Sequence, residues 1–151
     1  EVAAISGFYF TSYLNLLVRG AKPDEIVAFK YGDHGVKLYG NAVLVSEKFA
    51  AANPKAVTGF LRALRKGIAD VVAKPDEGIA ALKGRDGLID VKLETERLKL
   101  MIADQLDKSG KFTGAVDKAQ IEKNIADVVD AFGLKAKPAA DQVFNSSFLP
   151  N

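Results

Sequence analysis

Residues 36–73 read VKLYGNAVLVSEKFAAANPKAVTGFLRALRKGIADVVA, and the period of the apolar residues changes inside this stretch. Before Ser46 the apolar residues form an extended run that Gly40 and Asn41 interrupt. A glycine inside such a run often marks a β-bulge or a close approach of another backbone. After Ser46 they recur every three or four residues, which is the spacing of one face of an α-helix. The stretch therefore predicts a strand followed by helices.

The helical part of this stretch contains two helices with separate start signals. Ser46 is placed to cap a short helix over EKFAAA, and Asn53 precedes a proline that suits the first position of the next helix. That next helix is predicted from Pro54 to Ala73. We expect it to bury one apolar face, made of Val57, Phe60, Leu61, Leu64, Ile68, Val71 and Val72.

Helices also dominate the remainder of the chain. The patterns predict a short helix after Pro75, a longer one within residues 91–108, and a last one capped by Asp117 and ended by Gly133. The residues after that glycine are predicted to be irregular, although they contain aromatic side chains that need burial.

The first part of the chain is predicted to be richer in strands. Apolar or alternating runs at residues 2–6, 26–31 and 36–45 indicate three extended segments, and a helix that Thr11 or Ser12 would cap follows the first. Short strands followed by mostly helices are typical of an α/β fold.

The composition is that of one ordinary soluble domain. The 151 residues carry 21 basic and 19 acidic side chains, a formal charge of +2, and no cationic block, so we expect no nucleic-acid partner. No apolar run reaches the roughly 18 residues that a membrane span requires. The absence of cysteine excludes disulfides, thiolate metal sites and a cysteine nucleophile.

Residue types that carry catalysis are scarce. His34 is the only histidine, and the chain has no GxSxG, P-loop or GxGxxG motif. The carboxylates lie mainly on amphipathic helices, where a solvated face is their ordinary role. We therefore expect a protein that is not an enzyme and that holds no metal or cofactor. His34 itself suits either an exposed turn or a ligand contact.

Two clusters combine aromatic residues with small and hydrogen-bonding residues near predicted strand ends. The first is SGFYFTSY at residues 6–13, and the second joins YGDHG at 31–35 with YGN at 39–41. In α/β folds, ligands bind beyond the carboxyl ends of strands. The predicted ligand-binding residues are Ser6, Gly7, Tyr9, Thr11, Asp33, His34, Tyr39 and Asn41.

Within the first cluster, the aromatic rings suit either a core or a pocket wall. In an extended strand, Tyr9 would point away from Phe8 and Phe10, so the two phenylalanines would anchor the strand while Tyr9 faced a ligand. Gly7 would let the backbone approach that ligand closely. A helix beginning near Thr11 would offer its free N–H groups to an anionic or carbonyl group.

Three segments carry a resemblance to a known family. They are EVAAISGFYFTSYLNL at 1–16, YGDHGVKLYGNAVLVSEKFAAANPKAVTGFLRALRKGI at 31–68, and VFNSSFLP at 143–150. Together they resemble the substrate-binding proteins of ABC importers. The nearest group is the family named for thiamine-pyrimidine synthesis, which also contains nitrate-, sulfonate- and taurine-binding relatives. The resemblance covers essentially the whole chain and matches it to the second half of such a protein.

The resemblance implies a bilobed type II periplasmic-binding-protein fold with ligand held between the lobes. Residues 1–40 would belong to the second lobe and include the return through the hinge, where Gly35 and Gly40 would absorb backbone rotation. Residues 41–151 would form a helix-rich part that returns to the first lobe.

The function implied by the resemblance is capture of a small solute outside the cytoplasm, in the periplasm, and its delivery to an ABC permease in the membrane. The aromatic residues suit a planar or anionic organic solute, such as a thiamine pyrimidine precursor or an aromatic or sulfonated acid. Two alternatives stay open. One is an enzyme of the same family that makes the thiamine pyrimidine, and the other is a ligand-sensing effector domain.

The start of the chain predicts a longer protein. The sequence opens on a predicted strand without an initiating Met, and it shows no signal peptide, so we expect a signal peptide and an N-terminal half upstream. Unpaired strand edges invite association. We therefore expect the chain by itself to form an exchanged or sheet-extended dimer, or to associate with that N-terminal half.

Overall fold

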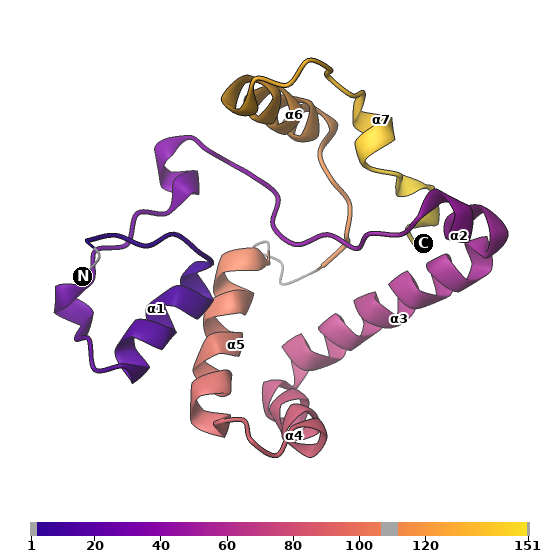
Figure 1. The fold of residues 1–151 in the computed structure, drawn as a ribbon. Coiled ribbons are helices and arrows are strands. Elements are labelled where there is room, and N and C mark those ends of the chain that lie inside the picture. Colours follow the sequence, from indigo (N-terminus) through magenta and orange to yellow (C-terminus); the bar gives the residue numbers. More distant parts are fainter. Residues whose placement is uncertain (1–2, 107–111, 151) are drawn as a thin grey trace. The chain divides into compact units, whose positions relative to one another are not determined.

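The computed structural model describes residues 3–106 and 112–150 of the protein, and every regular element in these ranges is a helix (Figure 1). Helical residues make up 64% of the described chain, and none of it forms a strand or sheet. The protein as described is therefore a helical one. The predicted α/β class, with short strands ahead of the helices, is wrong for this structure.

The described residues of the predicted strands do not pair with a neighbouring strand. The described part of residues 2–6, residues 26–30 and residues 36–45 have no regular structure, and Tyr31 begins a 3₁₀ turn. Extended backbone becomes a strand only when a neighbour accepts and donates its hydrogen bonds, which no described segment does here. Alternation predicted which segments could pair, and it carried no information on whether a partner lies beside them.

The chain divides into two compact units, which are described separately. Unit 1 comprises the described residues of 1–30 and 67–112, and unit 2 comprises those of 31–66 and 113–151. The predicted boundary between lobes at residues 40 and 41 concerns a longer bilobed protein and stays a prediction.

Unit 1 is built on helix α5 (Val91–Gln105), which packs against α1 (Tyr9–Val18) and α4 (Pro75–Arg85) (Figure 1). A 3₁₀ turn, η1 (Pro23–Glu25), follows α1. Among its described residues, Leu14 on α1 and Ile79 on α4 are the buried apolar ones.

An arginine joins α1 to α5 by polar contacts. The Arg97 guanidinium donates to the Phe10 carbonyl oxygen over 3.3 Å and to the Asn15 side-chain oxygen over 3.4 Å. Its Nε also lies 3.1 Å from a Glu94 carboxylate oxygen on the same helix. Five N–H donors on one rigid group allow a single side chain to bind both helices.

Unit 2 contains α2 (Glu47–Ala52), α6 (Lys118–Phe132) and α7 (Ala140–Val143), with 3₁₀ turns η2 (Tyr31–His34) and η3 (Ser146–Phe148). Helix α6 packs against α7. The buried residues in the described part of unit 2 are Val57, Asn124 and Ile125.

Helix α3 has the predicted bounds, Pro54–Ala73. Its predicted buried face is confirmed only in part, because Val57 is buried, Leu61, Leu64 and Ile68 are half-buried, and Phe60 is 57% exposed. Within the described ranges, no helix is long and apolar enough to cross a membrane.

Several helix ends follow the predicted signals. The Ser46 hydroxyl accepts from Phe49 N–H over 3.3 Å, the Asp117 carboxylate accepts from Gln120 N–H over 2.8 Å, and Gly133 ends α6 in the left-handed region at φ 59°. The predicted cap at Thr11 or Ser12 is wrong. Helix α1 begins at Tyr9, three residues before a helix capped by Thr11 would begin, and Phe8 precedes it in extended conformation.

Candidate functional site

The aromatic residues at the start of α1 form the best-organised cluster of unit 1. Because Tyr9 and Tyr13 lie four residues apart on one helix, their rings stack, with centroids 5.1 Å apart and an interplanar angle of 22°. The Lys30 ammonium lies 4.5 Å from the centroid of the Tyr9 ring and 2.6 Å from an Asp104 carboxylate oxygen. We call Tyr9, Tyr13, Lys30 and Asp104 the Tyr9 cluster.

The Tyr9 cluster joins a planar surface to a cation. An ammonium over an aromatic face is attracted by the ring quadrupole, by about 0.5–1 kcal/mol at an exposed site. Lys30 and Asp104 both keep part of their side chains in solvent. A ligand with a flat ring and an anionic substituent would find stacking area and an N–H donor within one site.

The prediction that Tyr9 points away from Phe8 and Phe10 in an extended strand is wrong, because residues 9–18 are helical. Phe8 and Phe10 nevertheless stack on one another, with centroids 5.4 Å apart, and Phe10 is half-buried. The two tyrosine rings therefore stack with each other, and the two phenylalanine rings stack with each other, at the start of a helix and not on a strand.

The other residues of the stretch 6–13 that were predicted to bind ligand are Ser6, Gly7 and Thr11, and the structure shows local contacts for the last two. The position of a Cβ at Gly7 lies only 2.3 Å from the Ser12 hydroxyl oxygen, so the glycine makes room for that side chain at the start of α1. Thr11 N–H donates to the Phe8 carbonyl within the first turn, over 3.0 Å. Ser6 is exposed.

In unit 2, an extended segment is held against the first turns of α6. The Lys37 carbonyl oxygen accepts from the Gln120 amide over 2.7 Å and from the Asn124 amide over 2.6 Å. The Tyr39 hydroxyl oxygen accepts from the Asp117 N–H over 2.8 Å. Tyr39, predicted to bind ligand, thus serves at the end of a helix in this structure.

Asn124 has one polar atom without a partner. Its side chain is 8% exposed, and while its amide nitrogen binds Lys37, its Oδ1 has no hydrogen-bond partner in the described part of the protein. A buried acceptor left unpaired costs about 1–3 kcal/mol.

The remaining predicted residues lie on the surface of unit 2. Asp33 and His34 belong to the exposed turn η2, and Asn41 is exposed in the segment after Tyr39. The eight predicted residues therefore fall into two groups of four, one in each unit. Lys30, Asp104, Gln120 and Asn124 were not predicted, since their partners lie more than seventy residues away in sequence.

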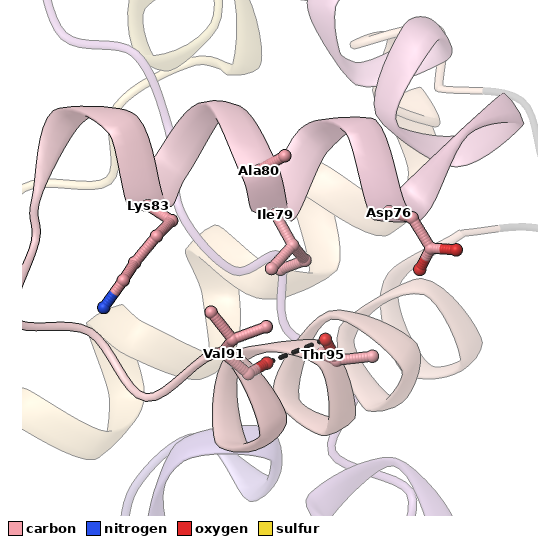
Figure 2. A pocket seen from close by; sticks show the side chains of 6 residues that line it. All are labelled: Asp76, Ile79, Ala80, Lys83, Val91 and Thr95. Atoms are coloured by element: carbon pink, nitrogen blue, oxygen red, sulfur yellow. Dashed lines mark hydrogen bonds between the residues drawn. The ribbon is translucent and has the colours of Figure 1, made fainter.

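A shallow hollow of about 460 Å³ lies between α4 and α5. Figure 2 shows Ile79 and Val91 facing one another across it. Two of its polar groups serve the fold, because the Thr95 hydroxyl donates to the Val91 carbonyl and the Lys83 ammonium donates to the Gly87 and Ile89 carbonyls. It is better understood as a packing gap than as a ligand site.

Several charges outside these clusters form ion pairs within one helix or at its start, such as Lys74 with Glu77 and Lys123 with Asp127. Glu96 accepts a hydrogen bond from Lys99 and attracts its charge, which raises the pKa of that exposed lysine above 10.5. No three His, Cys, Asp or Glu side chains are grouped for a metal among the residues that the structure describes.

Comparison with known proteins identifies a family. The family profile described as NMT1/THI5 like matches residues 1–78, which is more than half of the 151-residue chain. No curated protein and no solved structure matches the sequence. The matched range includes the Tyr9, Tyr13 and Lys30 side chains of the Tyr9 cluster and the whole of α3. The chain therefore belongs to the NMT1/THI5-like family.

Proposed function

We propose that the protein is the extracytoplasmic solute-binding component of an ABC importer, and that it captures a small planar or anionic organic solute. The family includes solute-binding proteins of ABC transporters, which supports this class of function. The Tyr9 cluster is the observation that favours this class of ligand. The membrane partner would be the importer's permease.

The Tyr9 cluster favours a planar solute because two tyrosine rings are already stacked, with 22° between their planes. A flat ring laid against such a pair gains about 0.5–1.5 kcal/mol beyond area burial. An anionic group on the solute would share the positive charge of Lys30 with the Asp104 carboxylate. A thiamine pyrimidine precursor would contact mainly the tyrosine rings, whereas a sulfonated or aromatic acid would contact both the rings and the Lys30 ammonium.

The proposal is tested by calorimetric titration of the protein with the hydroxymethylpyrimidine portion of thiamine, benzenesulfonate and taurine. Tyr9→Leu keeps apolar bulk against Tyr13 but removes the aromatic face, so it should weaken binding at least tenfold, about 1.4 kcal/mol. Phe10→Leu is the matched control and should leave the affinity unchanged. Equal losses in the two variants would place the solute elsewhere.

Two further measurements test whether the charge of Lys30 contributes to binding and whether the protein alters the solute chemically. Lys30→Met should weaken the binding of benzenesulfonate more than the binding of the pyrimidine. Lys22→Met, on the exposed loop before η1, should change neither affinity. Mass spectrometry of the solute after incubation should recover it unchanged. Recovery of a new product would favour the biosynthetic enzyme instead.

A further inference from the structure

A groove in unit 2 runs between the first turns of α3 and the turn η3. Its volume is about 550 Å³, and Lys55, Thr58, Gly59 and Arg62 line it from α3, with Ser147 and Phe148 from η3. The Arg65 guanidinium donates to the Pro150 carbonyl oxygen over 2.7 Å, which holds the residues after η3 against the helix. The groove is therefore built by two segments that lie far apart in sequence.

The charged side chains that line this groove in the described part of the protein, Lys55 and Arg62, are both positive. Lys55 and Arg62 are exposed, and neither forms an ion pair or hydrogen bond with any residue in the described ranges. They are seven residues apart, which places both on the same side of α3. The first acidic residue of α3 is Asp70, so no carboxylate of this helix lies near the groove to neutralise it.

The shape of the groove depends on a glycine. A Cβ at Gly59 would meet only the end of the Arg62 side chain, at 4.0 Å, so the space above this residue is open. Phe148 supplies a half-buried ring on the opposite wall, and Thr58 and Ser147 supply hydroxyls. The lining thus offers two cations, two neutral hydrogen-bonding groups and one aromatic surface.

We propose that this groove docks an acidic segment of a protein partner, with carboxylates at Lys55 and Arg62 and an apolar side chain against Phe148. A single small anion would remain mostly hydrated in so open a groove, whereas a peptide segment contacts all of these groups together. The inference is independent of the solute and of the Tyr9 cluster, which lies in unit 1.

The test is fluorescence anisotropy with a fluorescein-labelled peptide of four Glu-Glu-Leu repeats, titrated with the protein at low and physiological salt. Arg62→Glu should weaken binding at least about fivefold, and added salt should weaken the binding of the unaltered protein. Lys137→Glu reverses another exposed charge, outside the groove, and should change the affinity less than about twofold.

A second pair of variants tests shape without changing charge. Gly59→Leu places a side chain in the groove, and it should weaken binding as much as Arg62→Glu does. Gly67→Leu, on the same helix and with no atom near its Cβ position, should have no effect. Equal losses for Arg62→Glu and Lys137→Glu, or unchanged binding in Gly59→Leu, would overturn the proposal. Complete competition by equimolar inorganic phosphate would overturn it in favour of a small-anion site.

Discussion

At the scale of single residues, Asn124 connects sequence-distant parts of unit 2. Its amide donates to the Lys37 carbonyl oxygen over 2.6 Å from a position that is 92% removed from solvent, while its own oxygen stays unpaired. Gln120 donates to the same carbonyl oxygen from a less buried position. These two amides therefore differ in burial and not in partner, which makes them a natural pair for comparison.

We expect Asn124→Asp to destabilise unit 2 at neutral pH by about 1–3 kcal/mol, since a carboxylate would face a carbonyl oxygen without water. Burial would raise the pKa of the introduced carboxyl above its unfolded value of about 3.9. A raised folded pKa means that stability is complete below about pH 3.9 and is lost as the pH rises through the folded value.

Urea unfolding of Asn124→Asp and of a control variant, Gln120→Glu, across pH 3–8 measures this effect. Gln120→Glu introduces the same charge beside the same carbonyl oxygen, but solvent screens it, so its loss should be smaller and nearly independent of pH. A pH-independent loss in Asn124→Asp would show that the introduced carboxyl is solvated.

At the scale of elements, the described helices bury few residues and leave much of their surface in solvent. On α6, Ile125 is 8% exposed, while Val128, one turn later, is 40% exposed. The two residues share a helix and a β-branched side chain, so a comparison between them isolates burial from helix propensity.

Ile125→Ala should lower the free energy of unfolding by about 2–5 kcal/mol, because it removes buried methyl groups and leaves a cavity. Val128→Ala removes fewer methyl groups from a side chain that keeps 40% of its surface in solvent, so it should lower the free energy of unfolding by about 1 kcal/mol or less. Chemical denaturation followed by circular dichroism measures both. Similar losses in the two variants would mean that α6 is rotated from its described position.

At the scale of the whole molecule, an extended apolar segment stands out. Residues 37–45 form no backbone–backbone hydrogen bond within the described ranges, and Leu44 within them is 92% exposed. Unpaired backbone beside apolar side chains is the ordinary template for pairing with another chain.

We expect the protein to associate as its concentration rises, and light scattering should report a mass above 16.2 kDa. Leu44→Lys should reduce this association by charging the segment. Leu88→Lys is the control, since Leu88 is 96% exposed in the turn between α4 and α5, outside the segment. A monomer at all concentrations, or equal effects of the two variants, would contradict the prediction.

Sequence alone determined the features whose hydrogen bonds are local. The bounds of α3, the caps at Ser46 and Asp117, and the end of α6 at Gly133 follow from residues within one or two turns. The family likewise follows from the order of residues in the first half of the chain. An α-helix satisfies its backbone by i to i−4 bonds, so its own residues suffice to specify it.

Only the tertiary structure decided which distant residues meet. Lys30 with Asp104, and Lys37 with Asn124, are joined across more than seventy residues, and no local pattern marks them. The predicted strands failed for the same reason, because a strand needs hydrogen bonds from a neighbour that its own sequence does not name. Alternation predicts a capacity to pair, and the partner decides whether the sheet forms.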